Sequence, residues 1–160
     1  MCGIIGATSS RSVGKILIKG LHAMEYRGYD SAGVALNQDS EVFRLRSLGK
    51  VSSLEELMID NKPKAKSGIA HTRWATHGAP SEENAHPHGS HNEIYIVHNG
   101  IIENHDEIRD RLKSKGYKID SETDSELIAH LIHFNKIDSS STLEALVKAT
   151  KELKGAFSIA

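Results

Sequence analysis

Hydrophobic and polar residues first alternate in patterns typical of strands. Residues 2–7 form a short apolar run of strand length. Apolar positions within residues 34–36 and 42–45 flank a polar turn, which predicts a β-hairpin. Further strands are expected at residues 68–71 and 93–97, and the second of these is rich in β-branched and aromatic side chains. A long histidine-rich loop is expected between them.

Helices are indicated by the spacing of apolar residues and by their start signals. Between residues 16 and 24 apolar side chains recur at helical spacing. Four later segments place a cap residue three positions before a glutamate, as helix N-termini often do, although asparagine is a weaker member of this pattern than serine or threonine. The pairs are Ser53/Glu56, Asn104/Glu107, Thr123/Glu126 and Ser141/Glu144, with helices expected near residues 54–60, 105–115, 124–135 and 142–153.

The order of these elements predicts the fold class. Because hairpin-like strand pairs open the chain, a strictly alternating βαβ arrangement with a parallel sheet is not expected. We predict an α+β fold in which helices pack on antiparallel sheet. The length suits one domain, residues 1–160. Residues 155–160 have strand character with no polar tail after them, so this domain is expected to be C-terminally incomplete.

Composition excludes several function classes. Twenty basic and 21 acidic side chains give a formal net charge of -1, so no overall attraction to nucleic acid or to an anionic membrane is expected. No apolar run approaches the ~20 residues of a membrane-spanning helix. The single cysteine, Cys2, cannot form an internal disulfide. We therefore expect a soluble protein of a reducing, cytoplasmic compartment.

Cys2 is a candidate nucleophile because it follows Met1 directly. Removal of Met1 would leave a thiol and a free α-amino group on one residue. An α-amine has a pKa of about 7.7–8.0, so near neutrality part of it is unprotonated and can accept the thiol proton, directly or through water. One residue would then supply both nucleophile and base. The alternative is a small buried cysteine in the first strand.

A concentration of histidines between residues 71 and 105 raises the alternative of a metal-binding protein. Their spacing matches neither an HExxH helix nor a Cys/His finger, and Pro87 puts a rigid residue between two candidate ligands. We therefore favour hydrogen-bonded loop histidines and predict neither a metal nor another cofactor. The histidines are His71, His77, His86, His88, His91, His98 and His105.

Three further features fit a site for an amino acid. Asn99-Gly100 is a typical hairpin turn, but no convincing second strand follows, so the dipeptide could instead present a side-chain amide and a backbone N–H as oxyanion donors. Arg73 and Asp124 complement the α-carboxylate and α-ammonium groups of an amino acid. Each also has a simpler interpretation, as a surface charge for Arg73 and as a helix-start anion for Asp124.

Six ordered motifs resemble those of one enzyme family over essentially the whole chain. They are Cys2-Gly3-Ile4-Ile5-Gly6, Glu25 to Gly33, His71 to Gly78, His86-Pro87-His88, His98-Asn99-Gly100 and Ser121 to Asp124. Together they resemble the glutaminase domain of the isomerising glutamine–fructose-6-phosphate aminotransferases, also called glucosamine-6-phosphate synthases. These enzymes belong to the class II glutamine amidotransferases. The resemblance implies an N-terminal nucleophile hydrolase type four-layer sandwich, with two antiparallel sheets between helix layers.

The resemblance also implies roles for individual residues. Cys2 resembles the nucleophile, Arg27 a residue that supports it, and Asn99 and Gly100 the oxyanion hole. The resemblance implies that Arg73 binds the α-carboxylate of the substrate and that Asp124 accepts hydrogen bonds from its α-ammonium. The loop implied to close over the substrate contains Trp74, Thr76 and His77. His71, His86 and His98 match family positions near the site without an assigned role in proton transfer.

The implied reaction is hydrolysis of the side-chain amide of L-glutamine through a γ-glutamyl thioester. The ammonia would be transferred to fructose 6-phosphate in an isomerase half that these 160 residues lack, and the full-length relatives are expected to be homo-oligomers. One alternative is the glutaminase domain of a phosphoribosyl pyrophosphate amidotransferase, which also begins with Cys-Gly-Ile. Residues 26–30 and 71–78 resemble the aminosugar enzyme more closely. The other alternative is an inactive glutamine-binding fragment.

Overall fold

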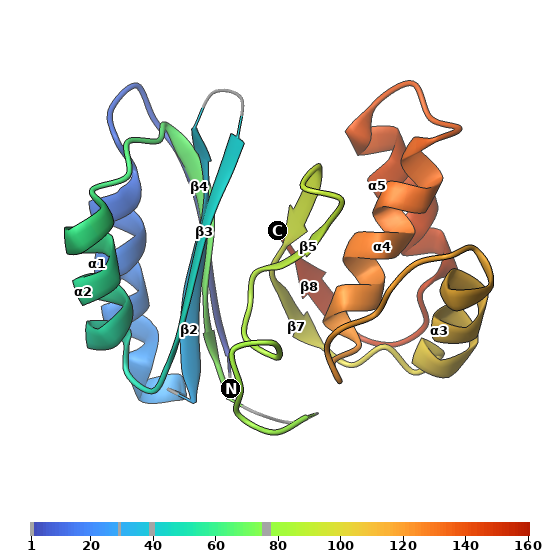
Figure 1. Cartoon of the computed structure of the whole chain (residues 1–160), viewed down its shortest axis with the longest axis horizontal. Helices are drawn as coiled ribbons and strands as arrows, with labels where there is room; N and C mark the ends of the chain where they lie inside the picture. The colour runs from blue at the N-terminus through green and yellow to red at the C-terminus, as the bar shows by residue number, and fades with distance from the viewer. Residues whose placement is uncertain (1, 29, 39–40, 75–77) are drawn as a thin grey trace.

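The elements of the chain are arranged in four layers, α, β, β and α (Figure 1). This computed structural model describes residues 2–28, 30–38, 41–74 and 78–160. Helices α1 (Gly14–Met24) and α2 (Val51–Asn61) cover the outer face of the first sheet, whereas α3 (His105–Ser114), α4 (Ser125–Lys136) and α5 (Thr142–Glu152) lie beyond the second strand layer. The layered, antiparallel α+β fold predicted from the sequence is confirmed.

The first sheet has four antiparallel strands in the order β1-β4-β2-β3. The predicted hairpin is confirmed, since β2 and β3 pair along their full length. Strand β4 lies between β1 and β2, and its register pairs Gly3 with Thr72. That register places Cys2 beside the residues that end β4. The bounds are β1 (Gly3–Thr8), β2 (Ser31–Gln38), β3 (Glu41–Leu48) and β4 (Ser67–Arg73).

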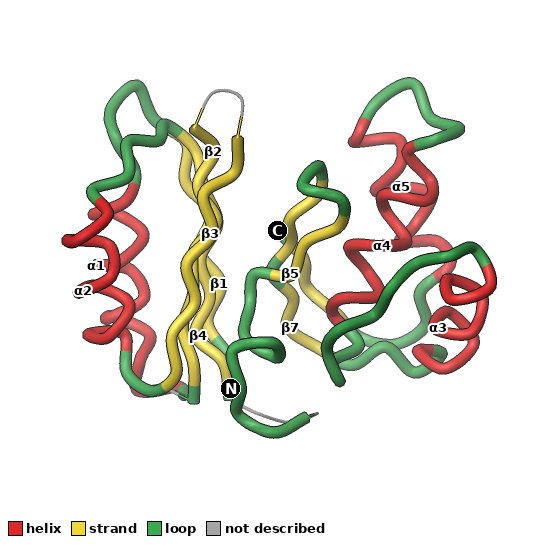
Figure 2. Tube along the Cα trace, in the orientation of Figure 1, coloured by secondary structure: helices red, strands yellow, loops and turns green. Residues whose placement is uncertain are grey.

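The second strand layer consists of two short antiparallel pairs, which lie between the first sheet and the C-terminal helices in Figure 2. They are β5 (His88–Ser90) with β6 (Ile94–Ile96), and β7 (His98–Gly100) with β8 (Phe157–Ile159). Asn99-Gly100 therefore lies inside a strand, and its interpretation as a hairpin turn is wrong. The partner of this strand is the segment that ends the chain.

Two hydrophobic clusters occupy the spaces between helices and strands. One lies under α1 and α2 and includes Leu17, Leu21 and Leu54, all completely buried. The other lies among the C-terminal helices and includes the completely buried Leu112 and Leu131. Within the described part of the chain, no helix is long and apolar enough to span a membrane.

The helices occur where they were expected, but the start signals are only partly correct. Ser141 caps α5, because its side chain accepts the N–H of Glu144 at 3.1 Å. Ser53 does not cap α2, which already begins at Val51. There the backbone N–H of Val51 donates instead to a carboxylate oxygen of Glu25 at 2.7 Å. A side chain distant in the sequence thus replaces the expected local cap.

The other two start signals also differ from expectation. The Asn104 side chain makes no bond to the first turn of α3 and instead contacts the backbone of Glu152 (2.9 Å) and Lys154 (2.9 Å). Helix α4 begins after Asp124, although the hydroxyl of Thr123 still accepts the N–H of Glu126 at 3.4 Å.

Candidate active site

Seven of the nine residues that the sequence nominated line one cavity of about 380 Å³. It lies where the start of β1, the end of β4, β7 and the start of α4 meet. The two remaining nominated residues, Thr76 and His77, lie outside the described residues. The seven are Cys2, Arg27, Arg73, Trp74, Asn99, Gly100 and Asp124, and the wall also includes His86, His98, Ile101, Thr123 and Ser125.

Cys2 reaches the cavity because it directly precedes β1, next to the end of β4. Its thiol is half-buried and is not part of a disulfide. The backbone N–H of Trp74 donates to Sγ at 3.2 Å, and the thiol in turn lies 3.6 Å from the Trp74 carbonyl oxygen. The two contacts with Trp74 hold Sγ at the cavity.

The amide of Asn99 lies over the backbone of Cys2. Its nitrogen donates to the Cys2 carbonyl oxygen at 3.1 Å, and its oxygen lies 2.8 Å from Nε2 of His71. An asparagine amide has two N–H bonds, so the contact with Cys2 leaves one for another acceptor. That acceptor could be an oxygen in the cavity.

Gly100 brings a backbone N–H to the same cavity through the register of β7. Residues 97 and 101 donate their N–H groups toward the C-terminal strand, to Ala160 (2.9 Å) and Ala156 (3.2 Å). Successive residues of a strand alternate in direction, so the N–H of Gly100 points away from that strand. Its φ is +137°, and a Cβ there would collide with the carbonyl oxygen of Ala156. Only glycine fits this position without strain.

A buried cation and a buried anion also line the cavity. The Asp124 carboxylate accepts the backbone N–H of Ile102 at 2.8 Å and the hydroxyl of Ser125 at 3.4 Å. The guanidinium of Arg73 donates to the carbonyl oxygens of Gly78 (3.2 Å) and Ala79 (3.4 Å). Burial lowers the pKa of Arg73, an effect opposed by the negative charges around it. Opposite charges in one pocket suit a zwitterionic ligand such as an amino acid.

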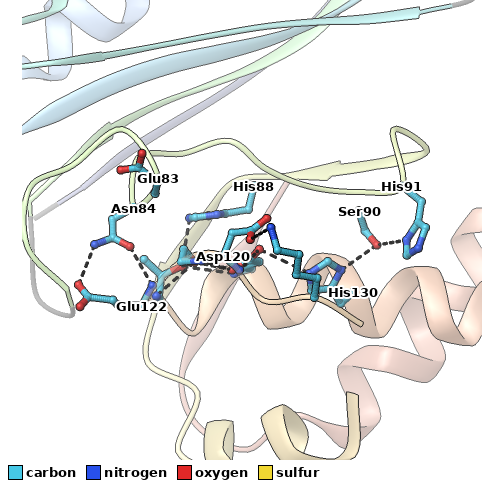
Figure 3. A network of polar contacts seen from close by, with 12 residues as sticks. Glu83, Asn84, His88, Ser90, His91, Asp120, Glu122 and His130 are labelled. Carbon is cyan, nitrogen blue, oxygen red and sulfur yellow. Dashed lines mark hydrogen bonds and ion pairs between the residues drawn. The ribbon is translucent and has the colours of Figure 1, made fainter. Parts of the chain in front are cut away.

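A polar network fixes the segment that carries Asp124 (Figure 3). The Asn84 side chain accepts the N–H of Glu122 at 2.9 Å and donates to its carboxylate at 3.0 Å. That carboxylate also accepts the N–H of Ala79 at 3.2 Å, next to the carbonyls that hold Arg73. Sequence reasoning missed Asn84, because a single asparagine in a polar loop gives no signal for a partner so distant in the chain.

Glu126 supports the same segment from inside the fold. It accepts the backbone N–H groups of Asp120 (3.1 Å) and Ser121 (2.6 Å). Burial by itself would raise the pKa of Glu126, but hydrogen bonds from His130, Ser121 and Asp120 outweigh it and lower that pKa to about 2. The charged carboxylate therefore holds the loop in place at all moderately acid and neutral pH values.

Three buried histidines lie in a row at the cavity, and only His86 of the three is part of its wall. The rings of His71 and His86 stack at 4.0 Å, and the ring of His88 meets that of His86 edge-on at 4.7 Å. Burial lowers the pKa of His71 to about 4 and that of His88 to about 3, and lowers that of His86 well below its ordinary value. Across the described ranges, no group of three or more His, Cys, Asp or Glu side chains could hold a metal ion.

Acidification is expected to destabilise the folded chain through these rings. Between pH 6.5, the ordinary pKa of histidine, and about pH 4, His71 is protonated in the unfolded chain but stays neutral in the folded chain. This contribution to stability is therefore complete above pH 6.5 and lost as the pH falls to 4, by about 3 kcal/mol for His71 alone. Urea unfolding over this pH range measures it. A matched H71Q variant should lose less stability, and an unchanged pH slope would contradict the assignment.

Comparison with known proteins gives one consistent result. A family model described as a glutamine amidotransferase domain matches residues 71–160. The chain is 56% identical over 158 residues to the isomerizing glutamine–fructose-6-phosphate aminotransferase of Haemophilus influenzae, covering 98% of this chain and 26% of that protein. The corresponding protein of Pseudomonas putida is 54% identical over 161 residues, covering 100% and 26%. The chain thus spans about a quarter of the length of these relatives.

A solved structure shows the same fold. Glutamine phosphoribosylpyrophosphate amidotransferase from B. subtilis, complexed with ADP and GMP, superposes with a TM-score of 0.85 at 24% identity, covering 99% of this chain and 34% of that one. This likeness confirms the N-terminal nucleophile hydrolase type fold predicted from the sequence. Since the family model matches more than half of the residues, the chain belongs to the glutamine amidotransferase domain family.

Proposed function

We propose that the chain hydrolyses the side-chain amide of L-glutamine, with Sγ of Cys2 as the nucleophile after Met1 has been removed. The observation that carries the proposal is the cavity itself. It joins the only cysteine of the chain to two oxyanion donors, at Asn99 and Gly100, and to a pair of opposite charges, Arg73 and Asp124. A nucleophile, oxyanion donors and a clamp for an amino acid are what this hydrolysis needs.

The first half of the reaction forms a thioester. The α-amine of Cys2 takes the thiol proton, and Sγ attacks the amide carbon of glutamine. The resulting oxyanion accepts the free N–H of the Asn99 amide and the N–H of Gly100. The C–N bond then breaks, and the α-ammonium of Cys2 returns the proton to the departing ammonia.

The second half releases glutamate. Water, deprotonated by the same amine, attacks the thioester carbon, and the oxyanion forms again between the same two donors. The C–S bond breaks, and the α-ammonium returns its proton to Sγ, which regenerates the thiol and the free amine. Arg27 lines the same cavity as Cys2, and we propose that it supports the nucleophile end of the site. Trp74, Thr76 and His77 are proposed to close over bound glutamine.

Recognition of the amino-acid head group is proposed to depend on the two charges. Arg73 would bind the α-carboxylate as a fork, a geometry that lysine cannot reproduce. Asp124→Asn is expected to weaken glutamine binding by about 2–5 kcal/mol, because the α-ammonium is left buried without its partner charge. Arg73→Lys keeps the positive charge but loses the fork, so it is expected to weaken glutamine binding through loss of the paired hydrogen bonds. Glutamine affinity, measured by calorimetry on Cys2→Ala chains that cannot turn over, checks this expectation.

The matched control for these variants is a second ligand. A primary amide that has the side chain of glutamine but neither head-group charge should bind the wild type and both variants equally. If Arg73→Lys weakened the binding of both ligands to the same extent, Arg73 would support the fold and would not recognise the α-carboxylate of glutamine.

For the longer protein, we propose that the ammonia is transferred to fructose 6-phosphate. Sequence identities of 56% and 54% to enzymes named for that sugar support this acceptor over phosphoribosyl pyrophosphate, whose enzyme is only 24% identical to this chain. Residues 1–160 would be part of one glutaminase domain, and the unpaired thiol suits a reducing, cytoplasmic compartment.

The experiment that tests this function compares two assays on the processed chain. Release of glutamate and ammonia from glutamine is expected, and it separates an enzyme from an inactive glutamine-binding fragment. In the full-length protein, fructose 6-phosphate should consume that ammonia, and phosphoribosyl pyrophosphate should not. Consumption by phosphoribosyl pyrophosphate alone would reassign the domain to the purine enzyme.

A further inference from the structure

We propose that His71 is a positioning residue that fixes the amide of Asn99, and with it one of the two oxyanion donors, in the orientation that the reaction needs. The inference rests on the proposed function, because that function assigns the amide N–H of Asn99 to the developing oxyanion. His71 itself does not line the cavity. It acts through Asn99.

The directions of two hydrogen bonds determine the state of His71. The carbonyl oxygen of Cys2 can only accept, so the nitrogen of the Asn99 amide must face it, at 3.1 Å. The oxygen of the same amide then faces Nε2 of His71, at 2.8 Å. Since that oxygen also only accepts, Nε2 must carry the proton. A rotated amide would place two acceptors together at Cys2.

The position of His71 makes this donor rigid. The residue lies in β4 between two strands, paired with Ile4 on one side and Gly33 on the other, and is completely buried. Its ring stacks on that of His86 at 4.0 Å with 14° between the ring planes. A ring packed in this way cannot swing aside to let the Asn99 amide rotate.

The ring of His86, on which His71 stacks, holds strand β7 at His98, the residue before Asn99. Nδ1 of His86 accepts the backbone N–H of His98 at 3.2 Å, one position before Asn99. The two stacked rings therefore hold β7 at two adjacent points, one through the backbone and one through the side chain. Both rings are kept neutral by burial, which lowers their pKa values. Neutral His71 can donate from Nε2 without placing a second charge beside Arg73.

This arrangement also excludes His71 as the general base for the thiol. A base needs a free lone pair directed at the proton it takes, whereas Nε2 of His71 carries a hydrogen that it donates to Asn99. The lone pair on Nδ1 is buried on a residue that does not line the cavity. The contribution of His71 is thus orientation of a donor. Loss of one oxyanion donor typically lowers kcat by about 10²–10³-fold.

The test compares two substitutions at this position. His71→Leu fills a similar volume with an apolar side chain and removes the Nε2–H donor. His71→Gln retains an N–H donor on a side chain of similar reach. We expect H71L to lower kcat for glutamine by about 10²-fold, with KM nearly unchanged, and H71Q to restore most of that loss. Alkylation of Cys2 by iodoacetamide, which needs no oxyanion hole, should proceed at the wild-type rate in both.

A double-mutant cycle separates positioning from general support of the fold. In an Asn99→Ala background the amide is already absent, so H71L should lower kcat by less than about twofold further. A loss in that background as large as in the wild type would overturn the proposal. His133→Leu removes another histidine, which contacts the Tyr117 hydroxyl outside the cavity lining, and should leave kcat unchanged in the folded chain even where stability falls.

A spectroscopic measurement on the wild type tests the proposal even if no variant folds. Nitrogen chemical shifts of the His71 ring at neutral pH should show a neutral ring protonated on Nε2. A ring protonated on Nδ1, or on both nitrogens, would overturn the assignment. If the wild type did not hydrolyse glutamine at all, the proposed function would fail, whereas this measurement would still report on the hydrogen bond.

Discussion

Replacing Cys2 by alanine is expected to reduce glutamine hydrolysis to the uncatalysed rate. The thiol is the only sulfur nucleophile in the chain, and its Sγ is held at the cavity by the N–H of Trp74 at 3.2 Å. An alanine leaves nothing to form the thioester, so the reaction loses its covalent intermediate and not merely part of its electrostatic stabilisation. Ammonia release, measured by a coupled assay with the matched wild-type chain, checks this result.

Glutamine binding is the control for this variant. The charges of Arg73 and Asp124 are untouched by the substitution, and the small side chain keeps the start of β1 in place. The dissociation constant for glutamine is therefore expected to stay within a few-fold of the glutamine concentration that half-saturates the wild type. Hydrolysis by C2A clearly above the uncatalysed rate would remove Cys2 from the mechanism.

A blocked N-terminus is expected to inactivate the chain as completely as C2A does. If Met1 is retained, or Cys2 is acetylated, the nitrogen of Cys2 becomes an amide and can no longer accept a proton. In the proposed mechanism a free amine, whose ordinary pKa is about 7.7–8.0, takes the thiol proton near neutrality. All side chains of the site remain present in the blocked chain, so its inactivity would identify the amine as the base.

The measurement uses one preparation before and after trimming. A chain made with Met1 retained is assayed, treated with methionine aminopeptidase and assayed again, with mass spectrometry to follow removal. Activity should rise in proportion to the trimmed fraction. Equal rates before and after trimming would contradict the amine as base and favour a Cys–His pair, with His77 or His98 as the base. His71 is not favoured, because its Nε2–H donates a hydrogen bond to the amide oxygen of Asn99.

Sequence patterns predicted the individual pieces of the site better than the way they meet. Cys2, Arg73 and Asp124 were nominated from their chemistry and their motifs. That they share a cavity depends on β1 pairing with β4 in one register, which sets Gly3 against Thr72. Strand pairing between distant segments depends on packing of the whole sheet, and no local pattern encodes it.

The errors have the same physical origin. Asn99-Gly100 looks like a turn because the dipeptide favours turns locally, but the C-terminal strand β8 pairs with it and makes it part of a strand. The start of α2 was misplaced because its cap comes from Glu25, outside the segment. The Asn84 contact with Glu122 was missed for this reason as well. Local propensity predicts elements, and tertiary contacts then override it at their ends.

The central claim is that glutamine is carried as a thioester on Sγ of Cys2. Rapid acid quenching of the processed chain during turnover, followed by peptide mass spectrometry, tests it most directly. The N-terminal peptide is expected to carry one γ-glutamyl group that hydroxylamine releases, and neither C2A nor the Met1-retained chain should carry it. Steady glutamate production with no such adduct, even when thioester hydrolysis is slowed, would contradict the account.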